Sequence, residues 1–297
     1  MSKKYEFTGK TKIIDNVAVH QIVRVKDGLI GGWIESEDNL SQLGNCFVYD
    51  NAIARGNSKV LNNAELRNNA KILMNVVVKD NAVMRDNSVA YDNAVIQDNS
   101  IVTMRARVRE NATVAENSKI GGVAIVEGSC LIRGNSRLLD NVIVKGNAYI
   151  KGNCLLRGKA FISGTTVVGD NAIIDGSSEI YDGNILSDSH IGGNTIINGK
   201  VLVIGKTEIL KGIIEDTVIV NETYKDIEYF SKYKEDGTRI GITSLLLGDE
   251  DEWIYNVLEG DRGVKSLKLS KDRLRDLLHK CGIDFKLMCD RLPGLSN

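Results

Sequence analysis

The chain has 297 residues, of which 42% are hydrophobic but only 5% aromatic, with 29 glycines and a single proline. Average chains contain roughly 5% proline, so this composition excludes a proline-rich disordered chain and a collagen. The 38 basic and 39 acidic residues leave a net charge of −1, so bulk charge gives no indication that nucleic acid or an acidic membrane surface is a partner.

The first 36 residues predict an N-terminal cap with strands over residues 5–7 and 17–25. Residues 1–12 are polar and basic and lack the apolar stretch of a secretory signal. No apolar run in the chain approaches the roughly 18 residues that span a bilayer. The five cysteines are scattered and show neither a disulfide framework nor metal-ligand spacing. We therefore expect a cytoplasmic protein without a membrane segment.

A six-residue repeat dominates residues 37–220. From Asn39 to position 177, every sixth residue is Asn at 18 of 24 positions, without insertion or deletion. The next residue is small, and the residue two further along is Val, Ile or Leu except at Ala54, Met84 and Ala90. Gly or Asp precedes the Asn column in 18 of 24 cases. Four columns that stay in phase over this length indicate a structural repeat.

Each hexad predicts a short strand followed by a corner. The small and aliphatic columns alternate with period two, so both face one side of the strand. Gly, Asp and Asn tolerate positive φ and favour turns. Strands of about four residues joined by two-residue corners wind into a coil, and stacked coils supply the core that one hexad lacks. Cys46, Cys130 and Cys154 fall in the small column, and we expect them to be buried. Stacked Asn side chains can form an amide ladder along each corner.

These columns resemble the hexapeptide-repeat proteins, which fold as left-handed parallel β-helices with three hexads in each triangular coil. Residues 31–41 and the hexads after them are similar to bacterial and prophage proteins that are labelled transferases because of their fold. The resemblance implies an all-β repeat fold, a left-handed β-helix of about 10 coils over residues 37–220. It also implies a phage or prophage setting and prisms that pair or trimerise side by side. Fold alone does not confer transferase chemistry.

After Leu186 the aliphatic column slips by one residue and continues through Ile191, Ile197, Val203 and Ile209. Residues 221–297 lack the Asn column and predict a small C-terminal α+β module. Residues 227–233 and 239–247 read as a hairpin around Asp236-Gly237, and residues 253–258 and 264–269 read as a second hairpin. Ser270 is a suitable N-cap for a helix over residues 271–281.

The three histidines are the candidate bases for acyl transfer. The resemblance implies the mechanism of hexapeptide-repeat acyltransferases. In these enzymes a histidine near a projecting loop removes a proton from the acceptor substrate, and acyl-CoA lies between subunits. His190 lies at the register slip and is the best candidate; alternatively, it fills the small-residue slot of an irregular corner. His20 and His279 lie in the terminal modules, and three histidines so far apart do not predict a zinc site. The uninterrupted hexads leave no room for the projecting loop, which argues against a transferase.

Two surface features are candidate binding sites. An outward apolar column, with one member in every eighteenth position, predicts a self-association face, although β-propensity alone also favours such residues; its members are Val77, Val95, Thr113, Leu131, Tyr149 and Val167. Arginines around a break in the Asn column form a candidate site for an anionic partner, or else a solvated face offset by Glu110 and Glu116; they are Arg105, Arg107, Arg109 and, three coils away, Arg55.

The leading hypothesis is a non-enzymatic, rigid protein-interaction scaffold without a cofactor or metal. It would be a phage- or prophage-associated accessory factor, with counter-defence as one role, and would bind a protein partner and itself as a dimer or trimer. The alternative is a hexapeptide-repeat acyltransferase that uses His190 and acyl-CoA. Nucleic acid is not an expected partner.

Overall fold

The computed structural model describes residues 3–203, 205–215, 219–220, 224–233, 239–247, 252–259 and 264–267. The chain divides into two compact units, residues 1–165 and residues 166–297. Both consist of β-strands, and the described residues contain no α-helix. No helix among them is long and apolar enough to cross a membrane.

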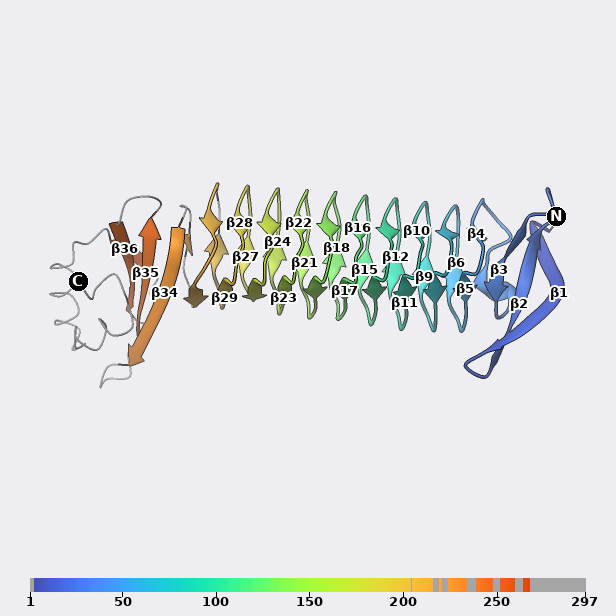
Figure 1. Cartoon of the computed structure of the whole chain (residues 1–297), viewed down its shortest axis with the longest axis horizontal. Helices are drawn as coiled ribbons and strands as arrows, with labels where there is room; N and C mark the ends of the chain where they lie inside the picture. The colour runs from blue at the N-terminus through green and yellow to red at the C-terminus, as the bar shows by residue number, and fades with distance from the viewer. Residues whose placement is uncertain are drawn as a thin grey trace. The chain divides into compact units, whose positions relative to one another are not determined.

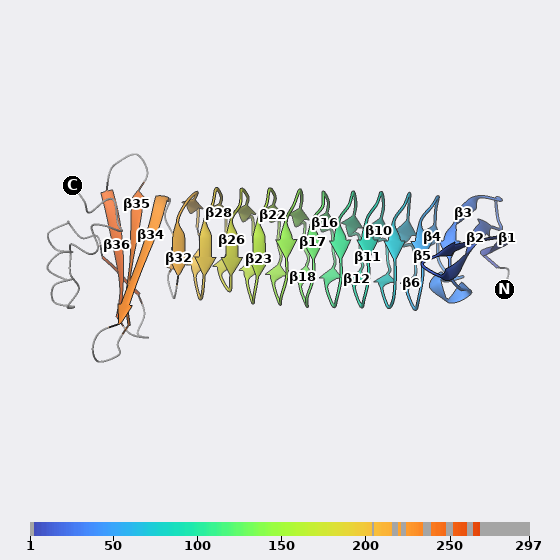
Figure 2. The same cartoon turned by 60° about the horizontal axis from the view of Figure 1, so that its bottom comes forward.

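The N-terminal unit contains three sheets whose short strands succeed one another in the chain (Figures 1 and 2). Sheet A has the order β1 (Tyr5–Ile14), β2 (Val17–Arg24), β3 (Ile30–Ile34), β5 (Ile53–Ala54), β8 (Lys71–Ile72), β11 (Val89–Ala90), β14 (Arg107–Val108), β17 (Ile125–Val126), β20 (Ile143–Val144) and β23 (Phe161–Ser163). Sheet B has the order β6 (Lys59–Val60), β9 (Val77–Val78), β12 (Val95–Ile96), β15 (Thr113–Val114), β18 (Leu131–Ile132) and β21 (Tyr149–Ile150). Sheet C has the order β4 (Phe47–Val48), β7 (Glu65–Leu66), β10 (Val83–Met84), β13 (Ile101–Val102), β16 (Lys119–Ile120), β19 (Arg137–Leu138) and β22 (Leu155–Leu156).

Each strand of these coils pairs in parallel with the strand 18 residues further along. Val95 of β12, for example, pairs with Thr113 of β15, and Ile96 with Val114. The second residue of each strand is buried, as is the small residue that precedes the strand, whereas the first residue is partly or fully exposed from β6 onward and buried at Phe47 and Ile53. The interior is therefore made of the two inward columns, including the buried Cys46, Cys130 and Cys154. The parallel β-helix predicted from the hexads is confirmed, with about ten turns in the two units together.

The corners follow the turn chemistry of the hexads. The residue before the Asn column has positive φ in every coil, for example Asp86 at 61°, Asp98 at 60° and Gly122 at 67°. Where the residue one coil earlier is acidic, its side chain can accept the backbone N–H of this position: Asp86 accepts from Met104 at 3.0 Å, and Asp98 from Glu116 at 2.9 Å. Asp therefore fills two needs, because it tolerates this conformation and satisfies the next coil's amide.

The predicted Asn ladders are present. Along the corner between sheets B and C, each amide nitrogen donates to the amide oxygen one coil later at 3.0–3.3 Å, through Asn45, Asn63, Asn81, Asn99, Asn117 and Asn135. The corner between sheets A and B carries the same ladder from Asn57 to Asn111. Side-chain hydrogen bonds thus reinforce the backbone ladder at the corners.

The N-terminal cap is an antiparallel extension of sheet A. Strands β1 and β2 form a hairpin whose turn residues, Asp15 and Asn16, have φ of 48° and 63°, as a two-residue turn of this kind requires. Strand β3 then pairs in parallel with β5, after which comes the 3-10 helix η1 (Glu37–Asn39). Tyr5 is fully buried, and its hydroxyl donates to the Leu40 carbonyl at 2.8 Å. The two predicted cap strands are confirmed, although the first extends to residue 14.

The C-terminal unit has three further rows of parallel strands. They are sheet D, with β26 (Glu179–Tyr181), β29 (Ile196–Asn198) and β32 (Ile213–Glu215); sheet E, with β24 (Val167–Val168), β27 (Asn184–Ile185), β30 (Leu202–Val203) and β33 (Ile219–Val220); and sheet F, with β25 (Ile173–Ile174), β28 (His190–Ile191) and β31 (Glu208–Ile209). Sheet F continues through β34 (Tyr224–Tyr233), β35 (Arg239–Leu247), β36 (Glu252–Glu259) and β37 (Val264–Leu267).

The register slip lies earlier than the aliphatic column predicted. Ile185, not Leu186, is the fully buried residue of its coil, and Ile185 pairs with Val168, 17 residues before it. The hexad after Ile180 is therefore one residue short, and the prediction that Leu186 is inward was wrong. The predicted inward residues after the slip, from Ile191 to Ile209, are all buried.

Both C-terminal hairpins are confirmed. Strand β34 pairs antiparallel with β35, and β36 with β37, while β36 also pairs with β35. The four strands thus form one antiparallel ribbon that begins beside β31, where Ile209 pairs with Tyr224. The predicted helix over residues 271–281 lies outside the described residues.

Candidate functional site

The apolar column predicted for the surface runs along sheet B. The pairs Val77–Val95, Val95–Thr113, Thr113–Leu131 and Leu131–Tyr149 lie side by side on successive strands. All five side chains point outward and are partly exposed. Val167, the last member of the predicted column, lies in the C-terminal unit, where it pairs with Asn184 on sheet E. The structure therefore brings together five of the six predicted interface residues in one row.

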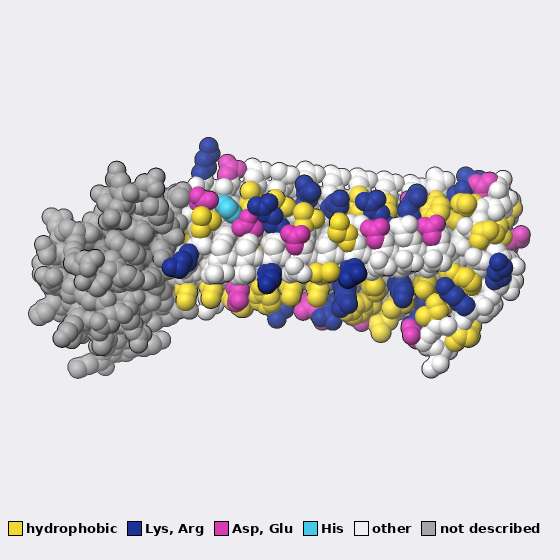
Figure 3. All heavy atoms as spheres, in the orientation of Figure 1, with side chains coloured by type: hydrophobic (Ala, Val, Ile, Leu, Met, Phe, Trp, Pro, Cys, Tyr) yellow, Lys and Arg dark blue, Asp and Glu magenta, His cyan; other side chains and the backbone are white. Residues whose placement is uncertain are grey.

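A second outward column accompanies the first on sheet B. It lies two residues further along the chain, just after each strand, and three of its five members are basic; they are Lys79, Gln97, the buried Ala115, Arg133 and Lys151. Arg133 pairs with Glu116 of the neighbouring corner at 2.8 Å, and the Lys151 ammonium lies 5.7 Å from the centre of the Tyr149 ring. The flat face of sheet B thus presents an apolar row beside a partly basic row. Figure 3 shows the opposite side of the N-terminal unit, where sheets A and C meet.

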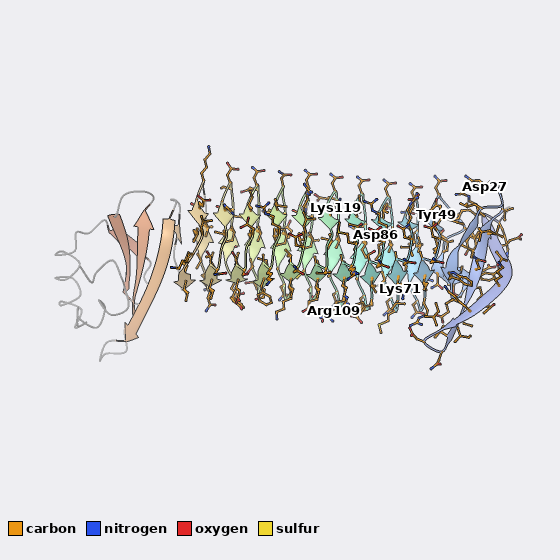
Figure 4. The ribbon with its side chains drawn as sticks, in the orientation of Figure 1. Asp27, Tyr49, Lys71, Asp86, Arg109 and Lys119 are labelled. Atoms are coloured by element: carbon orange, nitrogen blue, oxygen red, sulfur yellow. The ribbon has the colours of Figure 1, made fainter. Side chains whose placement is uncertain are left out.

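The four candidate arginines do not form one anion site. Arg55 donates to the carbonyl of Ile14 at 2.7 Å and pairs with Asp15 at 3.1 Å, so it holds the N-terminal hairpin. Arg109, labelled in Figure 4, pairs with Glu127 and donates to the Tyr91 hydroxyl at 2.9 Å. These contacts raise the pKa of Arg109. Arg105 and Arg107 are exposed, and they alone of the four point freely into solvent.

His190 lies between two carboxylates on sheet F. Its Nδ1 is 3.1 Å from Glu208 Oε1, and its Nε2 is 3.2 Å from Asp175 Oδ1. Both contacts are hydrogen bonds only when both ring nitrogens carry protons, because a carboxylate accepts and does not donate. His190 is the outward first residue of β28, whereas the buried Ser189 fills the small-residue slot. The alternative that placed His190 in that slot was wrong, because the slip precedes this coil.

Gly192 makes the contact between His190 and Asp175 possible. Gly192 follows Ile191, whose carbonyl accepts a hydrogen bond from the backbone N–H of Asp175 in the neighbouring coil. The N–H of Gly192 donates to the carbonyl of Ile209. A Cβ at position 192 would lie 2.7 Å from Asp175 Oδ1 and 3.2 Å from His190 Nε2. The missing side chain leaves the space over which the imidazole reaches Asp175.

The partners of His190 were missed by sequence reasoning, although a signal existed. Glu208 is 18 residues after His190, which is one coil, and the two are paired. The contact with Asp175 could not be predicted from the period of 18, because the short hexad makes the spacing between His190 and the coil before it one residue shorter. His20 contacts Thr11 Oγ1 at 3.1 Å within the cap hairpin, and His279 lies outside the described residues. Within the part of the chain that the structure describes, no three His, Cys, Asp or Glu side chains form a group that could hold a metal.

No protein-family model and no curated protein sequence matches this chain. Candidate functions therefore rest on the residues and their geometry.

Proposed function

We propose that the protein is a non-enzymatic interaction scaffold, whose β-helix presents the flat face of sheet B to protein partners, a second copy of the chain among them. The observation that carries the proposal is the row from Val77 to Tyr149 on five adjacent strands. Parallel strands hold these side chains at a fixed spacing of about 4.8 Å, so the face is preorganised and loses little conformational entropy on binding.

The phage or prophage setting, the counter-defence role and the cytoplasmic location belong to this same proposal. They are supported by the similarity of residues 31–41 and the hexads to prophage proteins. The proposal needs neither cofactor nor metal, since a rigid face binds through shape and apolar area.

Site-specific photo-crosslinking tests the scaffold. We expect a benzoylphenylalanine at position 95 to yield a crosslinked dimer or a crosslinked partner, since Val95 is central in the row. Position 89 is the matched control, because Val89 is also a partly exposed first residue of its strand, on sheet A. Equal crosslinking from the two positions, or none from either, would contradict an interface on sheet B.

A second candidate, the acyltransferase, is favoured by the pairing of His190 with Glu208. A carboxylate on Nδ1 orients an imidazole so that Nε2 accepts a proton from an acceptor substrate. Here Nε2 contacts Asp175, so this contact must open before His190 acts as a base. We expect acetyl-CoA to raise the melting temperature if this function is correct, and His190→Ala to abolish turnover. A protein that no acyl donor stabilises is not an acyltransferase.

A further inference from the structure

One corner of the N-terminal unit departs from the hexad rules in two successive coils. Along the corner between sheets C and A, Asn69 donates to Asn87 at 3.2 Å, and the ladder then ends because Arg105 and Val123 occupy the next two Asn positions. Met104 holds the positive-φ position before Arg105, with φ of 60°. Met104 is 56% exposed and Val123 is 42% exposed, and their backbones are stacked, since Arg105 donates to the carbonyl of Gly122.

Met104 takes the place of an acidic residue, so this part of the corner lacks a negative charge. Its Sδ accepts from the backbone N–H of Gly122 at 3.1 Å, in the place where an Asp or Glu oxygen accepts elsewhere. A thioether is a weaker acceptor than a carboxylate, so this exchange does not improve the fold. Asp86, one coil earlier and labelled in Figure 4, is occupied by the Thr103 hydroxyl and the Met104 amide. The corner, which carries Asp50, Asp86 and Asp140 in other coils, therefore has no acidic residue at this position over these two coils.

Gly121 leaves bare backbone beside the apolar corner. It does not have positive φ, and a Cβ at position 121 would lie 3.4 Å from both Leu139 Cδ2 and Thr103 Cγ2, which is ordinary contact. Neither backbone conformation nor packing therefore requires glycine here. A glycine of this kind within a strand row often marks a close approach by a ligand or by another backbone.

Unpaired cations flank the same corner on both sides. Arg105 and Arg107 lie on the side of sheet A, and Lys119 and Arg137 lie on sheet C, where they pair directly across β16 and β19. Like charges directly opposite each other destabilise a sheet. Among the described residues, none of these four cations has a carboxylate within ion-pair distance.

We propose that this corner binds an acidic protein segment that carries apolar side chains. The docking corner consists of Met104, Val123 and Gly121, with Arg105, Arg107, Lys119 and Arg137 around it. The corner is convex, so an extended segment can cross it and place carboxylates over the cations on both sides while its apolar side chains contact Met104 and Val123. Met and Arg are the residue types that protein interfaces favour. The inference rests on the proposed scaffold function and names a second surface and the chemistry of its partner.

A fluorescently labelled peptide of alternating Glu and Leu is the probe, and fluorescence anisotropy measures its binding to the full chain. We expect the triple variant Met104→Asp, Arg105→Asn, Val123→Asn, which restores the hexad residues, to weaken binding by about tenfold or more. Gly121→Thr fills the bare site without changing charge and should also weaken binding. Met74→Asp is the matched control, because Met74 is equally exposed, at 56%, has the same φ of 60°, and lies on a corner whose Asn ladder is intact. It should bind like the wild type.

Three results would overturn the inference: no binding to the wild-type chain, equal weakening by Met74→Asp, or tighter binding of duplex DNA than of the peptide at equal salt. Melting temperatures at or above that of the wild type show that the triple variant is folded. The double variant Val95→Lys, Leu131→Lys, which charges the row on sheet B, separates this inference from the proposed function. If charging sheet B abolishes association while the peptide does not bind, the scaffold stands and the docking corner fails.

Discussion

At the scale of single residues, the corners explain why Asp recurs before Asn. Asp86 accepts from the amide of Met104 and from the Thr103 hydroxyl at 2.5 Å. The hydrogen bond from Thr103 is the main cause of the lowered pKa of Asp86, because it stabilises the carboxylate. A lowered pKa in the folded state means that this stabilisation is present above the ordinary value of 3.8 and is lost as pH falls through the lowered value.

Asp86→Gly tests this account, since Gly occupies the same position in other coils and tolerates positive φ. We expect the variant to lose about 1–2 kcal/mol of unfolding free energy at neutral pH, from two lost hydrogen bonds to a carboxylate. The difference from the wild type should shrink as pH falls below 3.8, while the part due to greater freedom of the unfolded glycine persists. Urea unfolding at several pH values measures both. A difference that does not depend on pH contradicts the carboxylate's role.

The corners and their Asn ladder could be predicted from the sequence. The hydrogen-bond partners of particular side chains could be predicted only in part. The Asn ladder followed from the period of six and is confirmed. The contact of His190 with Asp175 depends on the exact position of the short hexad, and the aliphatic column placed the slip one hexad too late. The engagement of Arg55 by Ile14 and Asp15 depends on how the N-terminal hairpin folds back, which the hexads do not encode.

At the scale of the element, each two-residue strand has one inward and one outward side chain. On β18, Ile132 is fully buried, whereas Leu131 is partly exposed in the apolar row. Ile132 lies in the inward aliphatic column of the coil. The two neighbouring residues are thus similar in size and differ in role.

We expect Ile132→Ala to lower the free energy of unfolding by about 2–5 kcal/mol, because it leaves a cavity in a close-packed coil. Leu131→Ala is the matched substitution on the same strand and should lower it by less than about 1 kcal/mol. Urea unfolding of the two variants measures the contrast. Equal losses would mean that the faces of the strand are not assigned correctly.

The strands of the coils could be predicted because every column repeats the same residue type at the same position of many hexads. The elements outside the repeat were less predictable. The first cap strand extends to Ile14 because Gly9, with φ of 86°, carries the chain through the irregularity between Phe7 and Thr11. A single strand outside the repeat depends on tertiary pairing, and sequence pattern alone does not set its ends.

At the scale of the whole molecule, a net charge of −1 conceals a separation of charge. Within the described coils from β4 to β23, the charged residues of the outward faces are Lys and Arg, with Glu65 and Glu127 as the acidic exceptions, whereas the other acidic residues occupy the positive-φ corners. The corner acids are held there by the need to satisfy amides. The flat faces are therefore basic even though the chain as a whole is neutral. The single proline, Pro293, lies outside the hexad repeat, in keeping with the need of stacked strands for their backbone N–H groups.

Sedimentation velocity tests the central claim, that the row on sheet B is an interface. We predict that the wild-type chain sediments as a dimer or trimer and that the double variant Val95→Lys, Leu131→Lys sediments as a monomer, because lysines in the row leave unpaired charges in the contact. The control is Val89→Lys, Ile125→Lys, which places the same charges at partly exposed positions of sheet A and should leave the assembly intact. A monomeric wild type, or an assembly that survives the sheet B substitutions, would contradict the claim.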